Sequence, residues 1–215
     1  MGSFDLTKPK ALVCDLGNVL FYFDRQKTYK ALSRFCYKPP DEVQAIIEST
    51  DIRERYELGQ FTDTEFYATV LEMLELTDND LPFDDFSQVW GNIFTANYSL
   101  FETLALLRNQ LTLVMLSNTN NLHYLNIRKS YGNIMSFFFS DRKVLSYVEG
   151  IAKPDERIFH IARHKAQADF SECVYVDDII EYVTTAQSLG MRGIVYDSND
   201  KFINRVIEMG LVIPR

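Results

Sequence analysis

The chain has 215 residues, of which 47% are hydrophobic and 24% are charged. This is the balance of a globular protein with an apolar core and excludes a disordered chain. A net charge of −8 argues against general binding to nucleic acids or acidic membranes, because both rely on a basic protein surface. An anionic substrate must therefore be held by a bound metal ion or by a few well-placed lysines.

Cysteine usage and the N-terminal sequence both indicate a cytoplasmic protein. Cys14, Cys36 and Cys173 are odd in number, scattered and set among apolar residues, so we expect reduced thiols that pack in the core. The stretch from Met1 to Lys10 lacks the apolar segment of a signal peptide, and no run approaches the roughly 18 apolar residues of a membrane span. We expect no membrane and no nucleic-acid partner.

Short apolar runs with high β-propensity alternate with helical sequence. The four predicted strands are Ala11 to Cys14, Leu111 to Leu116, Cys173 to Val176 and Gly193 to Tyr196, with Met135 to Phe139 as a further candidate. The predicted helices between them include Leu100 to Arg108, Asp155 to His164 and Val183 to Leu189. This alternation predicts a doubly wound, Rossmann-like α/β fold with a parallel sheet, whose ligands bind at the carboxyl ends of the strands.

The interval 24–95 interrupts this alternation and contains no predicted strand. Apolar residues recur there at three- and four-residue spacing, which is typical of amphipathic helices. The expected helices are Thr28 to Cys36, Pro40 to Ser49, Arg53 to Leu58, Asp63 to Leu74 and Phe83 to Ile93. Pro39-Pro40-Asp41 and the segment Thr62 to Glu65 are favourable helix starts, and Asp41 to Gln44 fits a capping-box pattern loosely. We therefore expect an α/β core domain of residues 1–23 and 96–215 and an all-helical cap domain of residues 24–95.

Four polar segments are expected where strands of the sheet end, and each supplies a polar group to the same edge of the sheet. They are Asp15 to Val19, Ser117 to Asn120, Lys153-Pro154 and Asp177-Asp178. Each segment alone is more often a turn or a helix cap. Together they supply what phosphoryl transfer to a carboxylate requires: a nucleophile, ligands for a divalent cation, an ammonium group and small hydrogen-bond donors.

The proposed chemistry assigns a task to each group. A carboxylate such as Asp15 cannot approach a phosphate dianion unless charge is neutralised, so we expect Mg²⁺ and Lys153 beside it. Magnesium takes hard oxygen ligands, and the candidates are Asp15, Asp177, Asp178 and a backbone carbonyl near Gly17. Ser117 and the adjacent backbone amides can donate to the phosphoryl oxygens.

The order and spacing of these motifs resemble the haloacid dehalogenase-like hydrolase superfamily over about residues 11 to 197. The helical insert resembles its type-1 cap, which closes over the active site and carries specificity. The segment Asp15 to Val19, with Asp24-Arg25 and the segment Ser117 to His123, is similar to the bacterial branch that contains sugar-1-phosphate phosphatases such as glucose-1-phosphatase. The resemblance implies a Mg²⁺-dependent phosphatase that acts on a small phosphorylated metabolite through an aspartyl-phosphate.

The same resemblance implies residue roles. They are Asp15 as the nucleophile, Ser117 and Asn118 as phosphate-binding residues, Lys153 as the charge-stabilising and catalytic lysine, and Asp178 as the direct metal ligand with Asp177 beside it.

Two residues depart from the family pattern. Gly17 stands where most phosphatases of the superfamily have a second Asp that acts as general acid and base, a contribution typically worth about 10²- to 10⁴-fold. Tyr182 stands where many relatives have Asn. Because of Gly17, the alternative is a weakly active or inactive relative that binds a phosphorylated ligand or a protein. A metal-independent dehalogenase is a third hypothesis, which the pair Asp177-Asp178 disfavours.

Other candidates have a structural and a functional interpretation. Asp24-Arg25 is expected to begin a solvated helix, with a substrate contact as the alternative. His123 is either a substrate donor or a partly buried structural residue. His160 and His164 have the spacing of a zinc pair but lack a third ligand, so a surface helix is expected. The run Phe137 to Phe139 is expected to be strand core and not a stacking platform.

Overall fold

The computed structural model describes residues 8–138 and 140–213 and contains a five-stranded sheet in which every pair is parallel. The strand order is β5-β4-β1-β6-β7. The strands are β1 (Ala11–Cys14), β4 (Thr112–Ser117), β5 (Lys143–Leu145), β6 (Cys173–Asp177) and β7 (Arg192–Val195). The chain builds one half of the sheet outward from β1 and then crosses to the other half. This reversal beside β1 creates the crevice in which doubly wound proteins bind ligands.

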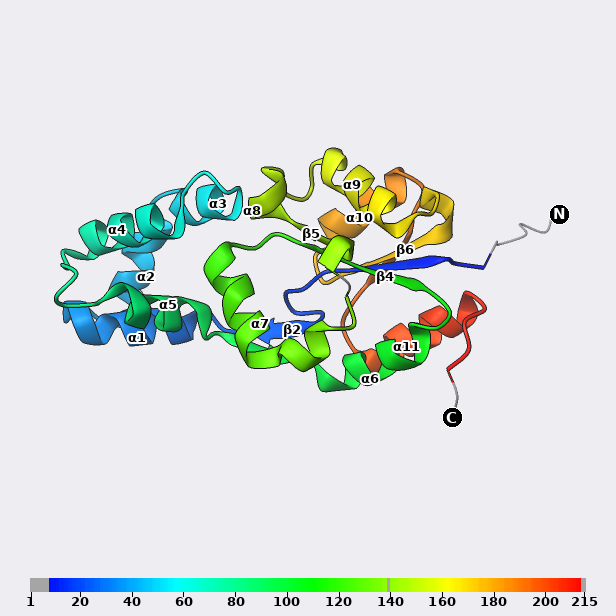
Figure 1. Cartoon of the computed structure of the whole chain (residues 1–215), viewed down its shortest axis with the longest axis horizontal. Coiled ribbons are helices and arrows are strands. Elements are labelled where there is room, and N and C mark those ends of the chain that lie inside the picture. Colours follow the sequence, from blue (N-terminus) through cyan, green and yellow to red (C-terminus); the bar gives the residue numbers. More distant parts are fainter. Residues whose placement is uncertain (1–7, 139, 214–215) are drawn as a thin grey trace.

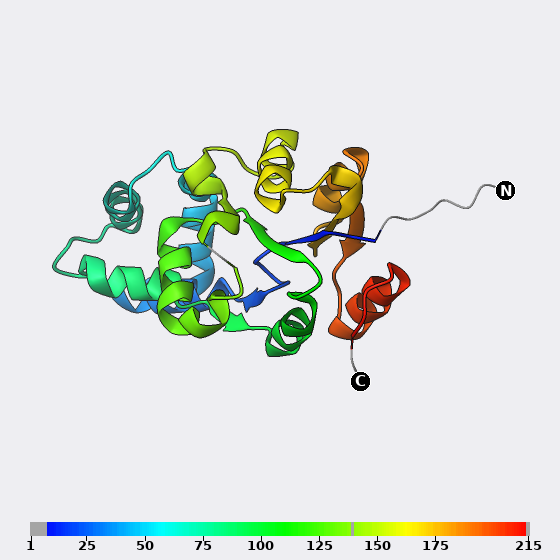
Figure 2. The same cartoon turned by 45° about the vertical axis from the view of Figure 1, so that its right-hand side comes forward.

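Helices cover both faces of the sheet, as Figures 1 and 2 show. One face packs against α6 (Tyr98–Leu107), α7 (Asn121–Met135) and α11 (Asn199–Glu208), and the other against α9 (Glu156–Ala166) and α10 (Ile180–Ser188). Alternate residues of β1 serve the two cores, because Leu12 and Cys14 face one side while Ala11 and Val13 face the other. The predicted α/β class is confirmed, and every residue of β1 is apolar because both faces are buried.

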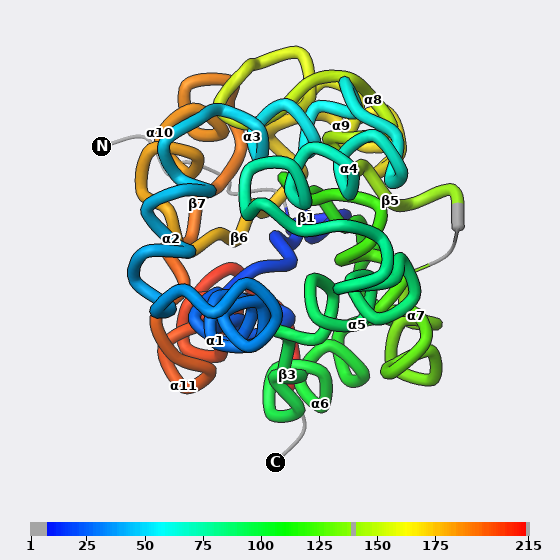
Figure 3. The backbone as a smooth tube through the Cα atoms, turned by 90° about the vertical axis from the view of Figure 1, so that its left-hand side faces the viewer, coloured from blue at the N-terminus to red at the C-terminus, as the bar shows by residue number. Residues whose placement is uncertain are grey.

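Five helices between the first and fourth strands pack around an apolar core of their own (Figures 1 and 3). They are α1 (Gln26–Cys36), α2 (Pro40–Glu48), α3 (Ile52–Glu57), α4 (Asp63–Leu74) and α5 (Phe83–Gly91). We call this set the cap. The predicted helix start at Thr62 is confirmed, and a capping box between Thr62 and Glu65, with both of its hydrogen bonds, precedes α4. The capping box loosely predicted at Asp41 to Gln44 is not formed, because Pro39 precedes α2 without a side-chain capping hydrogen bond.

Three short strands escaped the sequence analysis. β2 (Phe21–Phe23) and β3 (Phe94–Ala96) form an antiparallel ribbon at the base of the cap. The expectation that the interval 24–95 contains no strand was therefore wrong at its end, where β3 begins, and β2 just before the interval was not predicted. The further candidate strand, Met135 to Phe139, was also wrong over residues 135–138, because Met135 ends α7 and a turn follows. Phe139 lies outside the described residues. The edge strand is instead β5, and three-residue strands are too short to show a period.

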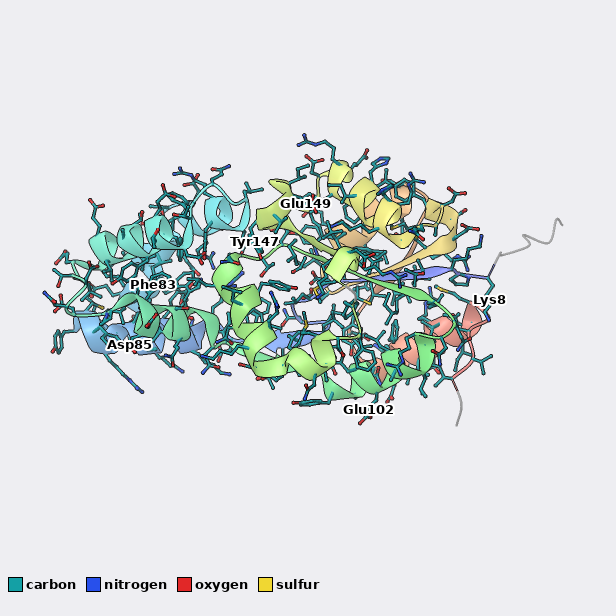
Figure 4. All side chains as sticks on the ribbon, viewed as in Figure 1. Lys8, Phe83, Asp85, Glu102, Tyr147 and Glu149 are labelled. Carbon is teal, nitrogen blue, oxygen red and sulfur yellow. The ribbon has the colours of Figure 1, made fainter. Side chains whose placement is uncertain are left out.

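The cap is seated on the core where α3 meets α8 (Ser146–Glu149). Ser146 Oγ donates to the carbonyl oxygen of Glu57 at 2.5 Å and accepts from the amide of Thr119 at 2.9 Å. Gly59 has a φ of +69°, and a Cβ on it would lie 2.2 Å from the carbonyl oxygen of Tyr147, a residue labelled in Figure 4. Only glycine fits this close backbone approach.

The remaining expectations concern cysteines and membranes. All three cysteines are free thiols, with Cys14 and Cys173 buried in the two sheet cores and Cys36 half-buried in the cap. No helix within the described residues combines the length and the apolar character needed to cross a bilayer.

Candidate active site

The carboxyl ends of three adjacent strands bring the predicted catalytic groups together. Asp15 directly follows β1, Ser117 ends β4 and Asp177 ends β6. The amide of Asp15 donates to the carbonyl oxygen of Val176 at 2.9 Å, which extends the β1–β6 pairing by one residue. Parallel strands place successive ends at one edge of the sheet, so residues more than 150 positions apart become neighbours.

Lys153 joins the two buried carboxylates. Its side chain is 1% exposed, and Nζ lies 2.6 Å from Asp15 Oδ1 and 2.7 Å from Asp177 Oδ2. The centroid of the Tyr182 ring lies 4.9 Å from Nζ, so Tyr182, one of the two residues that depart from the family pattern, packs against the lysine. Burial lowers the pKa of Lys153, but the two carboxylates outweigh this and raise it overall. The lysine is therefore held as an ammonium.

Burial also dominates the titration of the predicted nucleophile. It raises the pKa of Asp15 to about 7, with the positive charge of Lys153 opposing the shift and the negative charge of Asp177 adding to it. A second cation near Asp15 would stabilise the ionised carboxylate further.

Three carboxylates meet the chemical requirements of a magnesium site. One oxygen from each of Asp15, Asp177 and Asp178 lies within 4.8 Å of the others. Asp177 already accepts from Lys153, from the Tyr175 hydroxyl and from the amide of Ile179, whereas Asp178 Oδ2 accepts from Asn18 at 3.0 Å. The set offers hard oxygens, which suit Mg²⁺. Asp177 is the more heavily engaged of the pair.

Gly17 borders the same space as the nucleophile. A Cβ placed on it would lie 3.8 Å from Asp15 Oδ2 and only 2.9 Å from Cε1 of Phe23. The Phe23 ring thus occupies the position where a side chain at residue 17 would begin. The φ of Gly17 is not positive, so the backbone conformation itself does not require glycine.

The residues that follow β4 differ in their contacts. Ser117 is buried at the mouth of the site. The side-chain amide of Asn118 donates to the carbonyl oxygen of Lys153 at 3.0 Å and accepts from its backbone N–H at 2.8 Å. Asn118 therefore clamps the peptide that carries the lysine. Phosphate binding at Ser117 and Asn118 remains a prediction, for which the Asn118 backbone amide is the better candidate.

Cap and core residues enclose a cavity of about 50 Å³ above these groups, which we call the reaction cavity. Its polar lining residues are Gly17, Ser117, Asn118 and Thr119 of the core, together with Arg25, Glu57 and His123. Arg25 thus faces the site, while Asp24 Oδ1 accepts from the amide of Gln26 in the first helical turn. Burial raises the pKa of Glu57, and the positive charges of Arg25 and Arg53 oppose the shift.

His123 is a neutral residue that lines this cavity. Burial lowers its pKa to about 3, and the charge of Arg25 adds to the effect. Its Nδ1 lies 3.0 Å from the side-chain nitrogen of Asn120, and its ring packs against Trp90 and Phe94. Among residues 8–138 and 140–213, no group of three or more potential metal ligands includes His160 or His164.

The sequence analysis did not identify Phe23 or Glu57 as residues of the reaction cavity, nor did it identify Arg53 and Trp90 beside it. Their positions depend on how the cap packs on the core, which one sequence does not reveal. The run at Phe137 is not strand: Phe137 and Phe138 follow α7, and Phe138 is buried in the sheet core.

Comparison with known proteins settles the family. The model of haloacid dehalogenase-like hydrolases matches residues 9–190. The chain belongs to the haloacid dehalogenase-like hydrolase family. The predicted family is thereby confirmed, whereas the branch that contains sugar-1-phosphate phosphatases remains a prediction.

Solved structures of this family match nearly the whole chain. A family enzyme from Bacteroides thetaiotaomicron, in complex with magnesium and inorganic phosphate, has a TM-score of 0.78 and 24% identity, covering 90% of this chain and 99% of that one. Its magnesium complex is 25% identical, with a TM-score of 0.78 and coverage of 93% and 100%. The L-2-haloacid dehalogenase of Xanthobacter autotrophicus has a TM-score of 0.60 and 17% identity, covering 96% and 85%, which shows a shared fold alone.

Curated relatives are much longer than this chain. The drimenol cyclase drtB of Aspergillus calidoustus is 25% identical over 199 residues, which are 89% of this chain and 35% of that protein. Acyl-CoA dehydrogenase family member 10 of mouse is 38% identical over 84 residues, or 37% of this chain and 7% of that protein. The chain thus spans about a third or less of the relatives that it matches.

Proposed function

We propose that this chain is a Mg²⁺-dependent phosphatase of the cytoplasm that hydrolyses a small phosphate monoester, with sugar phosphates as the leading class. The observation that carries the proposal is the contact of 2.6 Å between Asp15 Oδ1 and Lys153 Nζ, beside carboxylate oxygens that gather within 4.8 Å. A buried carboxylate, a fixed ammonium and a hard cation site are what nucleophilic attack on phosphorus requires.

In the first step, a carboxylate oxygen of Asp15 forms a bond to phosphorus while the bond from phosphorus to the ester oxygen breaks. Asp15, Asp178 and the Gly17 carbonyl would hold Mg²⁺, which would supply positive charge to offset that of the phosphate. Lys153 fixes the orientation of Asp15 and offsets negative charge, and Ser117 donates to a phosphoryl oxygen. In the second step, water attacks the phosphorus of the acyl phosphate and frees Asp15.

Proton transfer to the leaving alcohol cannot come from residue 17, since Gly17 has no side chain. We assign this task to Glu57, which lines the reaction cavity and whose pKa is raised by burial. His123 is unsuited, because its pKa of about 3 keeps it neutral near pH 7. Glu57→Gln should slow alkyl phosphates about 10²-fold or more while affecting aryl phosphates little. Equal losses for both classes would remove Glu57 from this role.

The direct test is phosphate release from a panel of sugar, nucleotide and amino-acid phosphates, with Mg²⁺ present and after chelation. We expect release only with Mg²⁺, and none from the Asp15→Asn variant. Metal-independent release of chloride from a 2-chloro acid would instead support a dehalogenase. If the wild type releases phosphate from no compound of the panel but binds one of them measurably, the result would support a catalytically inactive binder, the alternative that Gly17 favours.

A further inference from the structure

A second cavity lies under the cap and adjoins the reaction cavity. We call it the cap cavity; it is bordered by Arg25, Thr28, Tyr29, Arg53, Glu57, Trp90, Ile93, Asn120 and His123. Four of these residues, Arg25, Glu57, Ile93 and His123, also border the reaction cavity. The two spaces therefore share a wall, and a group attached to a phosphate in the first can extend toward the second.

Buried hydrogen-bond donors around the cap cavity have no acceptor. Trp90 is 3% exposed, and its indole Nε1 has no hydrogen-bond partner among the described residues. The same holds, within residues 8–138 and 140–213, for Nε and Nη1 of Arg53. Buried polar groups are nearly always paired in native proteins, so each exception needs an explanation.

Other polar groups in the wall are satisfied within the protein. Tyr29 donates to Glu48 at 2.9 Å, Thr28 donates to the carbonyl oxygen of Val89 at 3.4 Å, and Asn120 is paired with His123 at 3.0 Å. Among the described residues of this wall, the fully buried side-chain atoms that lack a hydrogen-bond partner are all N–H donors. A ligand that completes this wall must bring acceptors, and two cationic side chains favour acceptors with negative charge.

The charges nearby leave room for such a ligand. Arg53 lies 3.5 Å from Glu54 through Nη2 and 4.0 Å from Glu48 through Nη1, and both glutamates are partly exposed to solvent. These long contacts do not provide an acceptor for Nε. Arg25 is a second cation, and Glu57 is the acidic group that faces the same cavity.

We propose that Arg53 and the Trp90 indole, with Arg25 on the shared wall, form a subsite for a second anionic group of the substrate. This inference rests on the proposed function and narrows the substrate class to phosphate monoesters that also carry a carboxylate or a second phosphate on the leaving group. The cap cavity has about 10 Å³, room for about one water, so the arginine side chains must move outward to admit the group.

Binding can be measured without turnover, because Trp90 is the single tryptophan of the chain. The Asp15→Asn variant with Mg²⁺ is titrated with 3-phosphoglycerate and with glycerol 3-phosphate, which differ by a carboxylate, while indole fluorescence is recorded. A second pair, fructose 1,6-bisphosphate and fructose 6-phosphate, tests the second phosphate. We expect at least one member with the extra anion to bind about tenfold or more tightly, as a charge-assisted hydrogen bond allows.

The variant Arg53→Met, added to Asp15→Asn, should reduce this preference to less than about threefold, whereas Arg55→Met should keep it. Arg55 is the matched control, since it lies on the same helix but is exposed and contacts Gln60 and Phe61. If Arg53→Met fails to fold, Trp90→Phe replaces it, with affinities measured by calorimetry. Equal affinity within both pairs, or a preference that survives loss of Arg53, would overturn the subsite.

The failure of this inference differs from failure of the proposed function. If the wild type releases phosphate but Asp15→Asn prefers neither ligand with the extra anionic group, the proposed phosphatase activity would be supported and the proposed subsite refuted. Wild-type protein that releases no phosphate, but whose indole fluorescence responds selectively to acidic ligands, would keep the subsite and remove the phosphatase.

Discussion

Replacing Gly17 with alanine tests whether the Phe23 ring leaves room for a side chain at residue 17, beside Asp15. The added Cβ would lie 2.9 Å from Cε1 of Phe23, about 0.5 Å short of the 3.4 Å at which ordinary contact begins. The Phe23 ring must move, and it would then weaken its contacts with Arg25 at 5.1 Å and Phe94 at 6.0 Å. Overpacking of this kind costs about 1–3 kcal/mol.

An opposite effect comes from the unfolded chain. Because Gly17 does not have a positive φ, alanine should gain about 0.4–1 kcal/mol by restricting the unfolded state. The net expectation for Gly17→Ala is a loss of about 1–2 kcal/mol in the free energy of unfolding. In a Phe23→Ala background the clash is absent, so the same substitution should be neutral or stabilising.

Urea unfolding of the four proteins in this double-mutant cycle measures the coupling, which we expect to equal the cost of the clash, about 1–3 kcal/mol. Gly132→Ala is the control, because a Cβ there meets nothing within 4 Å; it should not destabilise the protein in either background. Equal destabilisation by Gly17→Ala with and without the Phe23 ring would refute the steric account. Gly17→Asp should likewise assist alkyl phosphates only when Phe23 is shortened.

Three further predictions follow from the contacts of the site. Lys153→Met should lower turnover about 10²-fold or more and destabilise the protein, because Asp15 and Asp177 are left without their shared ammonium. Lys129 is exposed, so Lys129→Met should have neither effect. Similar phosphate-release rates for the two variants would contradict the placement of the site. Asn118→Ala should reduce kcat about tenfold or more, since both hydrogen bonds to the Lys153 peptide are lost; an effect on KM alone would argue against a positioning role. Burial lowers the pKa of His123 to about 3, so the neutral histidine contributes stability that is present above about pH 6.5 and is lost as the pH falls toward 3. Between pH 7 and 5, the free energy of unfolding measured in urea should therefore fall by about 1–2 kcal/mol less in His123→Phe than in the wild type.

The sequence contained strong local signals for the core of the site. Asp15, Asp177 and Asp178 each follow an apolar run that forms a buried strand, and Lys153 precedes a proline just before a helix, so chain order and fold class together predict that they share one edge of the sheet. The cap helices were predicted for a similar reason, because each is long enough to show a helical period.

The signals that failed were shorter or depended on tertiary contacts. β2, β3 and β5 have three residues each, fewer than a periodic pattern needs. Glu57 and Arg53 lie in a helix whose charged sequence suggests a solvated surface, and only the tertiary packing of the cap places them on the wall of the cap cavity. The clamp formed by Asn118 likewise joins two loops 35 positions apart, which no local pattern encodes.

The ribbon of β2 and β3 makes the cap a replaceable module. Phe23 pairs with Phe94 in that ribbon, so the chain leaves the sheet domain and returns to it at points about 5 Å apart. The 70 residues between these two phenylalanines connect two antiparallel strands, as the loop of a β-hairpin does. A different insert with the same closely spaced ends would leave the sheet, Asp15 and Lys153 in place. Changes of substrate can therefore arise in this segment without disturbing the chemistry below it.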